Sequence, residues 1–236
     1  MALVGYTNAG KSSILRGLSG SAEVVVEDRL FATLDPLTRE VDVGAGGGAR
    51  VLLTDTVGFI RRLPHDLVAS FRATLEEVTQ ADLLLHVIDA SYPEWEEQRD
   101  VVEEVLAEIG AGSVPIRYVF NKMDQMPDQD AAALRERVGN LMPGSVFVSA
   151  LSAGGLAPLR AILTEARQSL RPLYAIRLPG ADSGRWLAEL YRQADVASVG
   201  SDDATVVVEA RLDPVLLGRL RQAGAQVAPV AKSRVV

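Results

Sequence analysis

The fold is decided by a stretch near the start of the chain, Gly5-Tyr6-Thr7-Asn8-Ala9-Gly10-Lys11-Ser12-Ser13. The stretch fits the pattern G-x-x-x-x-G-K-[ST], in which glycines allow backbone amides to surround phosphate groups. An apolar run precedes it at Ala2–Gly5, and a helical pattern follows it at Lys11–Leu18. The amino terminus of a helix also favours an anion. We therefore predict a P-loop fold in which this stretch contacts the phosphates of a nucleotide.

Apolar runs of strand length alternate with helical patterns over the first 170 residues. The further strand-like runs are Val41–Val43, Arg50–Asp55, Leu83–Asp89, Ile116–Asn121 and Ser145–Ser149. The helical patterns between them are Pro64–Gln80, Trp95–Ile109, Asp128–Asn140 and Leu156–Ser169. Because such alternation produces right-handed crossovers, we expect an α/β P-loop domain with a mostly parallel sheet at residues 1–170.

The pattern changes after Leu170-Arg171-Pro172. We expect a second, small α+β domain at residues 171–236, with a hairpin turn at Gly200–Asp203. Its expected elements are a strand at Tyr174–Leu178, a helix at Ser183–Asp195, strands at Val196–Val199 and Ala204–Leu212, and a helix at Pro214–Ala223. This is the order of a ferredoxin-like domain, with Val227–Val230 as the candidate for its final strand.

Three more short motifs end strand-like runs, in this order along the chain: Asp55-Thr56-Val57-Gly58, Asn121-Lys122-Met123-Asp124 and Ser149-Ala150-Leu151. Since the carboxyl ends of parallel strands meet at one edge of a sheet, all four motifs can reach a single ligand. A carboxylate at Asp124 can accept hydrogen bonds from both N1–H and N2–H₂ of guanine, a donor pair that adenine lacks. The order of motifs therefore predicts a site for GTP and GDP, and disfavours an enzyme that uses ATP.

The expected roles follow from the chemistry of each side chain. Lys11 should reach the β- and γ-phosphates, and Ser12 should place its hydroxyl on Mg²⁺. Asp55 should hold the same ion through a water molecule, and the Gly58 amide should sense the γ-phosphate. Thr33 and Thr38 both qualify as the threonine that completes the coordination of Mg²⁺.

The base should be held by the two later motifs. We expect the stem of Lys122 to cover one face of the base and Asn121 to tie the base-binding loops together. The amide of Ala150 can donate to guanine O6. His86 lies in a run that is otherwise apolar, and we expect it to be a core residue rather than a metal ligand.

Composition narrows the class of protein. The 236 residues carry a formal net charge of −7 and no cysteine, which excludes disulfides and a catalytic thiol and fits a reducing, cytoplasmic setting. The acidic charge disfavours non-specific binding of nucleic acid by the whole chain, although residues 171–236 hold 9 Lys+Arg against 7 Asp+Glu. No apolar run approaches the roughly 20 residues that span a bilayer, so we expect no membrane span.

The P-loop stretch, Phe31-Ala32-Thr33-Leu34-Asp35 and the string Asp55-Thr-Val-Gly-Phe-Ile-Arg-Arg-Leu-Pro-His-Asp-Leu-Val68 together closely resemble the HflX family of ribosome-associated GTPases. Residues 1–170 resemble its G domain and the remainder its C-terminal domain. The resemblance implies a cytoplasmic, Mg²⁺-dependent GTPase that binds the large ribosomal subunit through rRNA and protein and splits or rescues stalled ribosomes. It implies nucleotide contacts from Phe31 to Asp35 and favours Thr33 over Thr38. We expect a monomer.

Hydrolysis should rest on Lys11, Thr33 and Gly58. Many GTPases place a glutamine after D-x-x-G to orient the attacking water, but this chain has Phe59, which cannot form that hydrogen bond. Slow intrinsic turnover follows, with a partner or another residue placing the water. Members of the family carry an N-terminal domain and a helical linker before the first strand, and the printed sequence begins at that strand. A nucleotide-dependent binding module with negligible hydrolysis is therefore the alternative function.

Overall fold

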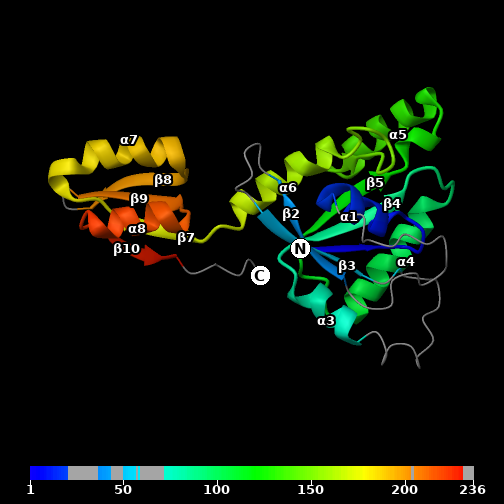
Figure 1. The fold of residues 1–236 in the computed structure, drawn as a ribbon, viewed down its shortest axis with the longest axis horizontal. Helices are drawn as coiled ribbons and strands as arrows, with labels where there is room; N and C mark the ends of the chain where they lie inside the picture. Colours follow the sequence, from blue (N-terminus) through cyan, green and yellow to red (C-terminus); the bar gives the residue numbers. More distant parts are fainter. Residues whose placement is uncertain (21–36, 44–49, 57, 59–71, 203–204, 231–236) are drawn as a thin grey trace. The chain divides into compact units, whose positions relative to one another are not determined.

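The computed structural model describes residues 1–20, 37–43, 50–56, 58, 72–202 and 205–230. The chain divides into two compact units, Met1–Thr164 and Glu165–Val236 (Figure 1). The boundary between the two units falls within helix α6 (Ala157–Ser169), whereas the division expected from the sequence follows this helix, after residue 170.

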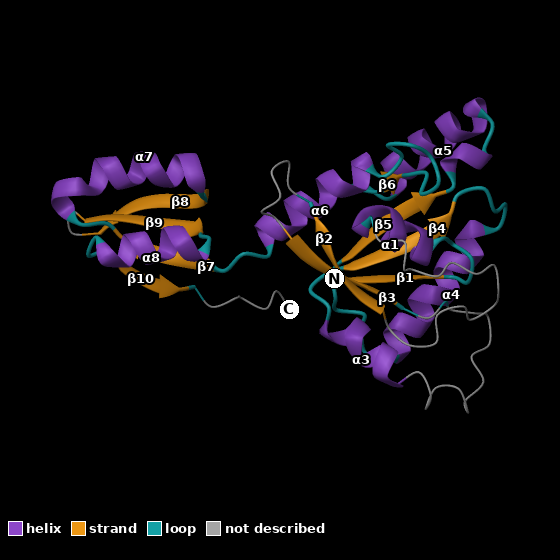
Figure 2. Ribbon diagram, viewed as in Figure 1, coloured by secondary structure: helices purple, strands orange, loops and turns teal. Residues whose placement is uncertain are grey.

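The first unit is built on a six-stranded sheet with the order β2-β3-β1-β4-β5-β6. Only β2 is antiparallel to its neighbour, and the other pairs are parallel. Helices lie on both sides of this sheet (Figure 2). The strands are β1 (Ala2–Gly5), β2 (Leu37–Asp42), β3 (Arg50–Asp55), β4 (Leu84–Asp89), β5 (Ile116–Asn121) and β6 (Val146–Phe147). The described helices besides α6 are α1 (Lys11–Ser19), α3 (Arg72–Gln80), α4 (Trp95–Glu108), the short 3₁₀ turn η1 (Met123–Gln125) and α5 (Asp128–Leu141).

The central strands are buried, as their apolar runs predict. Phe120 of β5 and Ile88 of β4 form one cluster with side chains of α4 and α5, and Ala2, Val4 and Leu84 form another with α3 and α4. His86 of β4 is 1% exposed, which confirms it as a core residue. Burial lowers the pKa of His86 to about 3, so its ring is neutral.

Two edge strands differ in length from the sequence-based prediction. β2 extends to Leu37 because all six of its residues pair with β3. Its residues alternate between covered and exposed, but Thr38, Arg39 and Glu40 are polar and give little apolar signal. β6 is shorter than the predicted Ser145–Ser149, because only Val146 and Phe147 pair with β5.

Helix α6 is fastened to the rest of the first unit by polar contacts. The guanidinium of Arg160 donates to the carbonyls of Gly17 (3.4 Å), Leu18 (2.9 Å) and Asp42 (2.7 Å). The hydroxyl of Thr164 donates to the carbonyl of Val43 at 2.7 Å. These bonds join α6 to the end of α1 and to the end of β2.

The second unit has the expected β-α-β-β-α-β order, with an antiparallel sheet arranged β10-β7-β9-β8. The final strand expected near Val227 is present and pairs with the first strand of the unit. Asp213 caps α8 by accepting from the amide of Leu216 at 2.7 Å. The elements are β7 (Leu173–Arg177), η2 (Gly180–Asp182), α7 (Ser183–Gln193), β8 (Asp195–Asp202), β9 (Thr205–Arg211), α8 (Pro214–Gln222) and β10 (Gln226–Pro229).

The predicted turn at Gly200–Asp203 is wrong in its position. Gly200, Ser201 and Asp202 are paired with Val207, Val206 and Thr205, so they belong to β8. Gly, Ser and Asp are turn-forming residues by composition, but the apolar register of β9 keeps them in the ladder. Within the described residues, no helix is both long and apolar enough to cross a membrane.

Candidate nucleotide-binding site

The structure brings the four motifs together at the carboxyl edge of the first sheet. Strands β1, β3 and β5 end at Gly5, Asp55 and Asn121, respectively. Ser149 follows β6 closely, and its hydroxyl accepts from the amide of Asp124 at 3.1 Å. Because these ends belong to the same edge, the motifs form one candidate site.

Two glycines shape the phosphate loop, because a side chain at either position would be strained and crowded. Gly5 has a φ of 150°, and a Cβ there would lie 2.3 Å from the carbonyl oxygen of Val87. Gly10 has a φ of 97°, and a Cβ there would lie 2.2 Å from Nδ2 of Asn121. Asn8 also adopts a left-handed conformation, with a φ of 60°. This backbone turns the loop sharply into α1, whose first residue is Lys11.

Lys11 is held inside the loop. Its side chain is 6% exposed, and its ammonium donates to the carbonyls of Gly5 and Tyr6, at 3.1 Å in each case. Burial lowers the pKa of Lys11 to about 8, and the negative charge of Asp55 opposes this change. A buried ammonium with backbone oxygens as partners is poised to exchange them for phosphate oxygens. The ring of Tyr6 packs on the α3–α4 cluster, so only its backbone serves the loop.

Ser12 and Asp55 lie together behind the loop. The hydroxyl of Ser12 donates to Oδ2 of Asp55 at 2.5 Å, and Asp55 is 1% exposed. Thr56 fixes the next position by donating to the carbonyl of Leu3 at 2.6 Å. A hydroxyl beside a carboxylate is the oxygen-donor set that suits Mg²⁺ shared with phosphates. The described residues contain no group of three or more His, Cys, Asp or Glu that could hold a metal alone.

Gly58 packs directly on the phosphate loop. A Cβ at this position would lie 2.8 Å from Cγ2 of Thr7 and 3.2 Å from Nζ of Lys11. The backbone of the D-x-x-G motif can approach the lysine only because Gly58 has no side chain. Gly58 therefore lies beside both the phosphate loop and the ammonium of Lys11.

Asn121 joins the loops as expected from the sequence. Its side chain is 2% exposed, donates to the carbonyl of Ala9 at 3.0 Å and accepts from the amide of Ala150 at 3.1 Å. The phosphate loop and the loop after β6 are therefore tied through one residue. The amide of Ala150, which we expected to donate to guanine O6, is already engaged by Asn121, so a guanine oxygen would share it. Leu151 is 70% exposed beside it.

The rest of the third motif divides between core and surface. Met123 is 7% exposed and packs in the α4–α5 cluster, so its side chain faces away from a ligand. Asp124 is exposed. The ammonium of Lys122 donates to Oδ2 of Asp89 at 2.7 Å. Asp89 was not predicted as a site residue, although a carboxylate at the carboxyl end of a buried strand was a usable signal.

Part of the expected site lies outside the described residues: Phe31, Ala32, Thr33, Leu34, Asp35, Val57 and Phe59. Thr38 is described, and it lies in β2 with its hydroxyl 2.8 Å from that of Thr54. The hydroxyl of Thr38 is thus paired within the sheet, whereas Thr33 lies outside the described residues.

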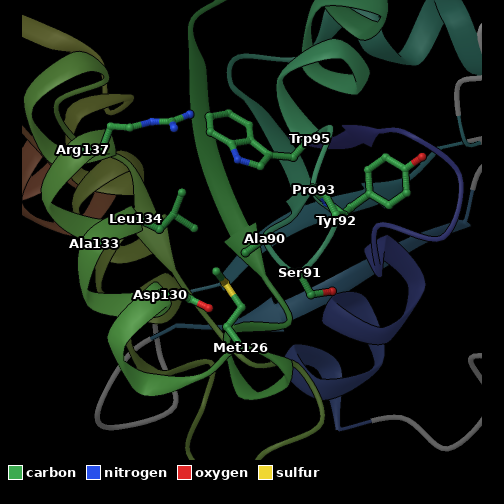
Figure 3. Close-up of a pocket in the computed structure, with 10 residues that line it drawn as sticks. All are labelled: Ala90, Ser91, Tyr92, Pro93, Trp95, Met126, Asp130, Ala133, Leu134 and Arg137. Atoms are coloured by element: carbon green, nitrogen blue, oxygen red, sulfur yellow. The ribbon is translucent and has the colours of Figure 1, made fainter.

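A cavity of about 340 Å³ opens between the loop after β4 and helix α5 (Figure 3). Ser91 and Tyr92 from the loop after β4 line one side, and Leu134 and Arg137 of α5 line another. Trp95 packs edge-on against Phe120, with ring centroids 5.0 Å apart. Met126, the residue that follows η1, also lines the cavity, whereas no residue of the phosphate loop does.

Comparison with known proteins gives consistent matches. A family model described as "50S ribosome-binding GTPase" matches residues 1–122. The GTPase HflX of Magnetococcus marinus is 47% identical over 224 residues, which cover 94% of this chain and 49% of the relative. The GTPase HflX of Escherichia coli (strain K12) is 41% identical over 221 residues, 93% of this chain and 50% of the relative. The chain thus spans about half the length of the curated relatives it matches.

Solved structures share the fold. A GTP-binding protein from the archaeon Sulfolobus solfataricus, in complex with GDP, is 29% identical with a TM-score of 0.55, over 72% of this chain and 52% of that one. Era in complex with MgGDPNP and a segment of 16S ribosomal RNA is 21% identical with a TM-score of 0.57, over 86% of this chain and 73% of that one. At the latter identity the likeness concerns the fold alone.

Proposed function

The chain belongs to the 50S ribosome-binding GTPase family, as a relative of the HflX GTPases, and on this premise we propose that it is a switch that binds and hydrolyses GTP. The observation that carries the proposal is the position of Asn121, which ties the phosphate loop to the loop after β6 and leaves Asp124 exposed at the same edge. A ligand that uses both ends of this arrangement has phosphates and a guanine base.

In this proposal each residue acts on a defined part of the nucleotide. Lys11 binds the β- and γ-phosphates, and Gly58 senses the γ-phosphate. Ser12, Thr33 and, through water, Asp55 hold Mg²⁺, which when bound neutralises charge that develops on the phosphates. Asp124 accepts from guanine N1–H and N2–H₂, and Ala150 donates to O6 while it remains bound to Asn121. The same set of contacts would bind GDP with fewer phosphate interactions.

Base recognition is tested by the variant Asp124→Asn. An amide at this position supplies the donor that the extra carbonyl of xanthine requires, so we expect GDP affinity to fall and XDP affinity to rise. Fluorescent analogues of both diphosphates, titrated against parent and variant, measure this change in base preference. Equal GDP affinity in the two proteins would show that Asp124 does not read the base.

We further propose that the partner is the ribosome, in particular its large subunit. In this proposal the protein acts in the cytoplasm, in the rescue or splitting of stalled ribosomes. The name of the matching family and the relation to the HflX proteins support this partner. Co-sedimentation with separated ribosomal subunits, in GDP and in a non-hydrolysable GTP analogue, tests it. Binding that is absent in both nucleotide states would contradict the proposal.

The alternative function is nucleotide-dependent binding with negligible hydrolysis. Phe59 favours it, because its side chain offers no hydrogen bond to an attacking water. Multiple-turnover release of phosphate, measured with and without ribosomes while binding is followed in parallel, separates the two functions. Turnover that stays at background while the ribosome is bound would favour the binding module.

A further inference from the structure

We propose that Asp89 is a positioning residue for Lys122, and that through this lysine it sets the affinity of the site for the purine ring. The inference rests on the proposed function, in which the stem of Lys122 covers one face of the base. Asp89 belongs to none of the four motifs, and it lies at the end of β4, next to the strand that carries Asn121.

The first observation is an ion pair between neighbouring strand ends. The ammonium of Lys122 lies 2.7 Å from Oδ2 of Asp89, and their side chains are 25% and 16% exposed. Asp89 is in register with Asn121, the residue before the lysine, so the backbone ladder sets the distance between the two partners. Exposed ion pairs contribute little because water and side-chain freedom compete with them, but this pair is mostly covered and pre-placed.

The second observation concerns the other oxygen of the carboxylate. Oδ1 of Asp89 accepts from both the amide (3.0 Å) and the hydroxyl (2.6 Å) of Ser91. One oxygen is thus fixed by the loop after β4, and the other is turned toward the lysine. The carboxylate cannot rotate away from Lys122 without losing the bonds to Ser91.

The third observation is the backbone of Lys122 itself. This residue has φ 64° and ψ 30°, a left-handed conformation that is unfavourable for a residue with a side chain. It persists because neighbours hold the turn: the amide of Met123 donates to the carbonyl of Val148 at 3.2 Å, and that of Gln125 donates to the carbonyl of Lys122 at 2.9 Å. The backbone fixes one end of the lysine and Asp89 fixes the other, which leaves the aliphatic stem stretched between them for the base.

A double-mutant cycle tests whether Asp89 acts through Lys122. The full chain is prepared as the parent, Asp89→Asn, Lys122→Met and the double variant, and the affinity of each for a fluorescent GDP is measured. Loss of a charge-assisted hydrogen bond should weaken binding about tenfold in Asp89→Asn. In the Lys122→Met background the same change should have no further effect, because the lysine that it positions is gone. Effects that multiply in the double variant would overturn the proposal, since Asp89 would then act independently of the lysine.

A second readout separates positioning from general damage. The face of a purine carries no information about its exocyclic groups, so Asp89→Asn should weaken GDP and IDP by the same factor. Asp124→Asn should instead affect the two differently, because only guanine has the 2-amino group. Unequal losses for GDP and IDP in Asp89→Asn would contradict an action through the lysine stem.

Two further variants complete the design. Asp130→Asn makes the same substitution on α5, at the cavity that Ser91 also lines (Figure 3), and should leave GDP affinity unchanged. Ser91→Ala removes one of the two donors to Asp89 and should weaken GDP about threefold even if Asp89→Asn does not fold. If the parent binds GDP and neither Ser91→Ala nor Asp89→Asn changes the GDP affinity, the role of Asp89 is refuted while the proposed function stands. A parent that binds neither GDP nor GTP would refute the proposed function itself.

Discussion

Replacement of Asn121 by alanine should destabilise the first unit strongly, even without nucleotide. The side chain is 2% exposed, and its loss deprives the carbonyl of Ala9 and the amide of Ala150 of their partner. A buried polar group left without a hydrogen bond costs about 1–3 kcal/mol. Ala9 is 1% exposed and should incur the higher cost, whereas the half-buried amide of Ala150 can reach water. The expected loss is therefore about 2–5 kcal/mol in the free energy of unfolding.

Each unit contains one of the two tryptophans, so the free energy of unfolding can be measured for each unit separately. Trp95 packs in the core of the first unit and Trp186 lies against that of the second. In a Trp186→Phe background, urea unfolding followed by fluorescence reports on the first unit alone. Asn140→Ala, an exposed position in α5, makes the same substitution without a buried partner and should change the unfolding free energy by less than about 0.5 kcal/mol. An Asn121→Ala variant as stable as this control would refute the reasoning.

Three other outcomes follow from the site. Because burial lowers the pKa of Lys11 to about 8, GDP binding should weaken, and should take up a proton, as the pH rises above about 8. The stability of the nucleotide-free chain should increase between pH 8 and about pH 10.5, because in this range the lysine keeps its proton in the unfolded chain and loses it in the folded chain. Calorimetry in two buffers measures the uptake, and Lys11→Met should abolish it. Gly58→Ala, whose Cβ would meet Thr7 at 2.8 Å, should weaken a GTP analogue about tenfold more than GDP, and equal losses would contradict the γ-phosphate role. Thr38→Val should leave Mg²⁺-dependent phosphate release intact while Thr33→Val removes it, and the reverse result would assign the metal to Thr38.

Much of the fold was predictable because the central strands carry their own signal. β1, β3 and β5 have the predicted bounds, since each is a short apolar run that ends at a motif residue. The first half of β2 was missed, because Thr38, Arg39 and Glu40 continue no apolar run before the predicted strand at Val41–Val43, and only pairing with β3 reveals it. The turn at Gly200 failed for the converse reason: local composition favoured a turn, while the register with β9 kept the residue in a strand.

The residues of the candidate site were likewise predictable only in part. The spacing of motifs located Lys11, Asp55 and Asn121, because each motif is contiguous in sequence. The partnership of Asp89 with Lys122 could not be predicted, since it depends on which strand lies beside β5 and on their register. Likewise, the bond between Ala150 and Asn121 exists only once two separate loops are folded together.

The contacts of α6 have a mechanical consequence. This helix spans the boundary between the two units, and Arg160 and Thr164 bind the carbonyls of Asp42 and Val43 at the end of β2. Because Arg160 also donates to the carbonyls of Gly17 and Leu18, tension transmitted along α6 would act both on β2, an edge strand, and on α1, which begins at Lys11. The opposite end of β2 begins at Leu37, directly after the segment that contains Thr33. A force applied to the C-terminal unit would therefore act on the helix that follows the phosphate loop as well as on β2, and a force-clamp experiment should show a change in the rate of nucleotide release.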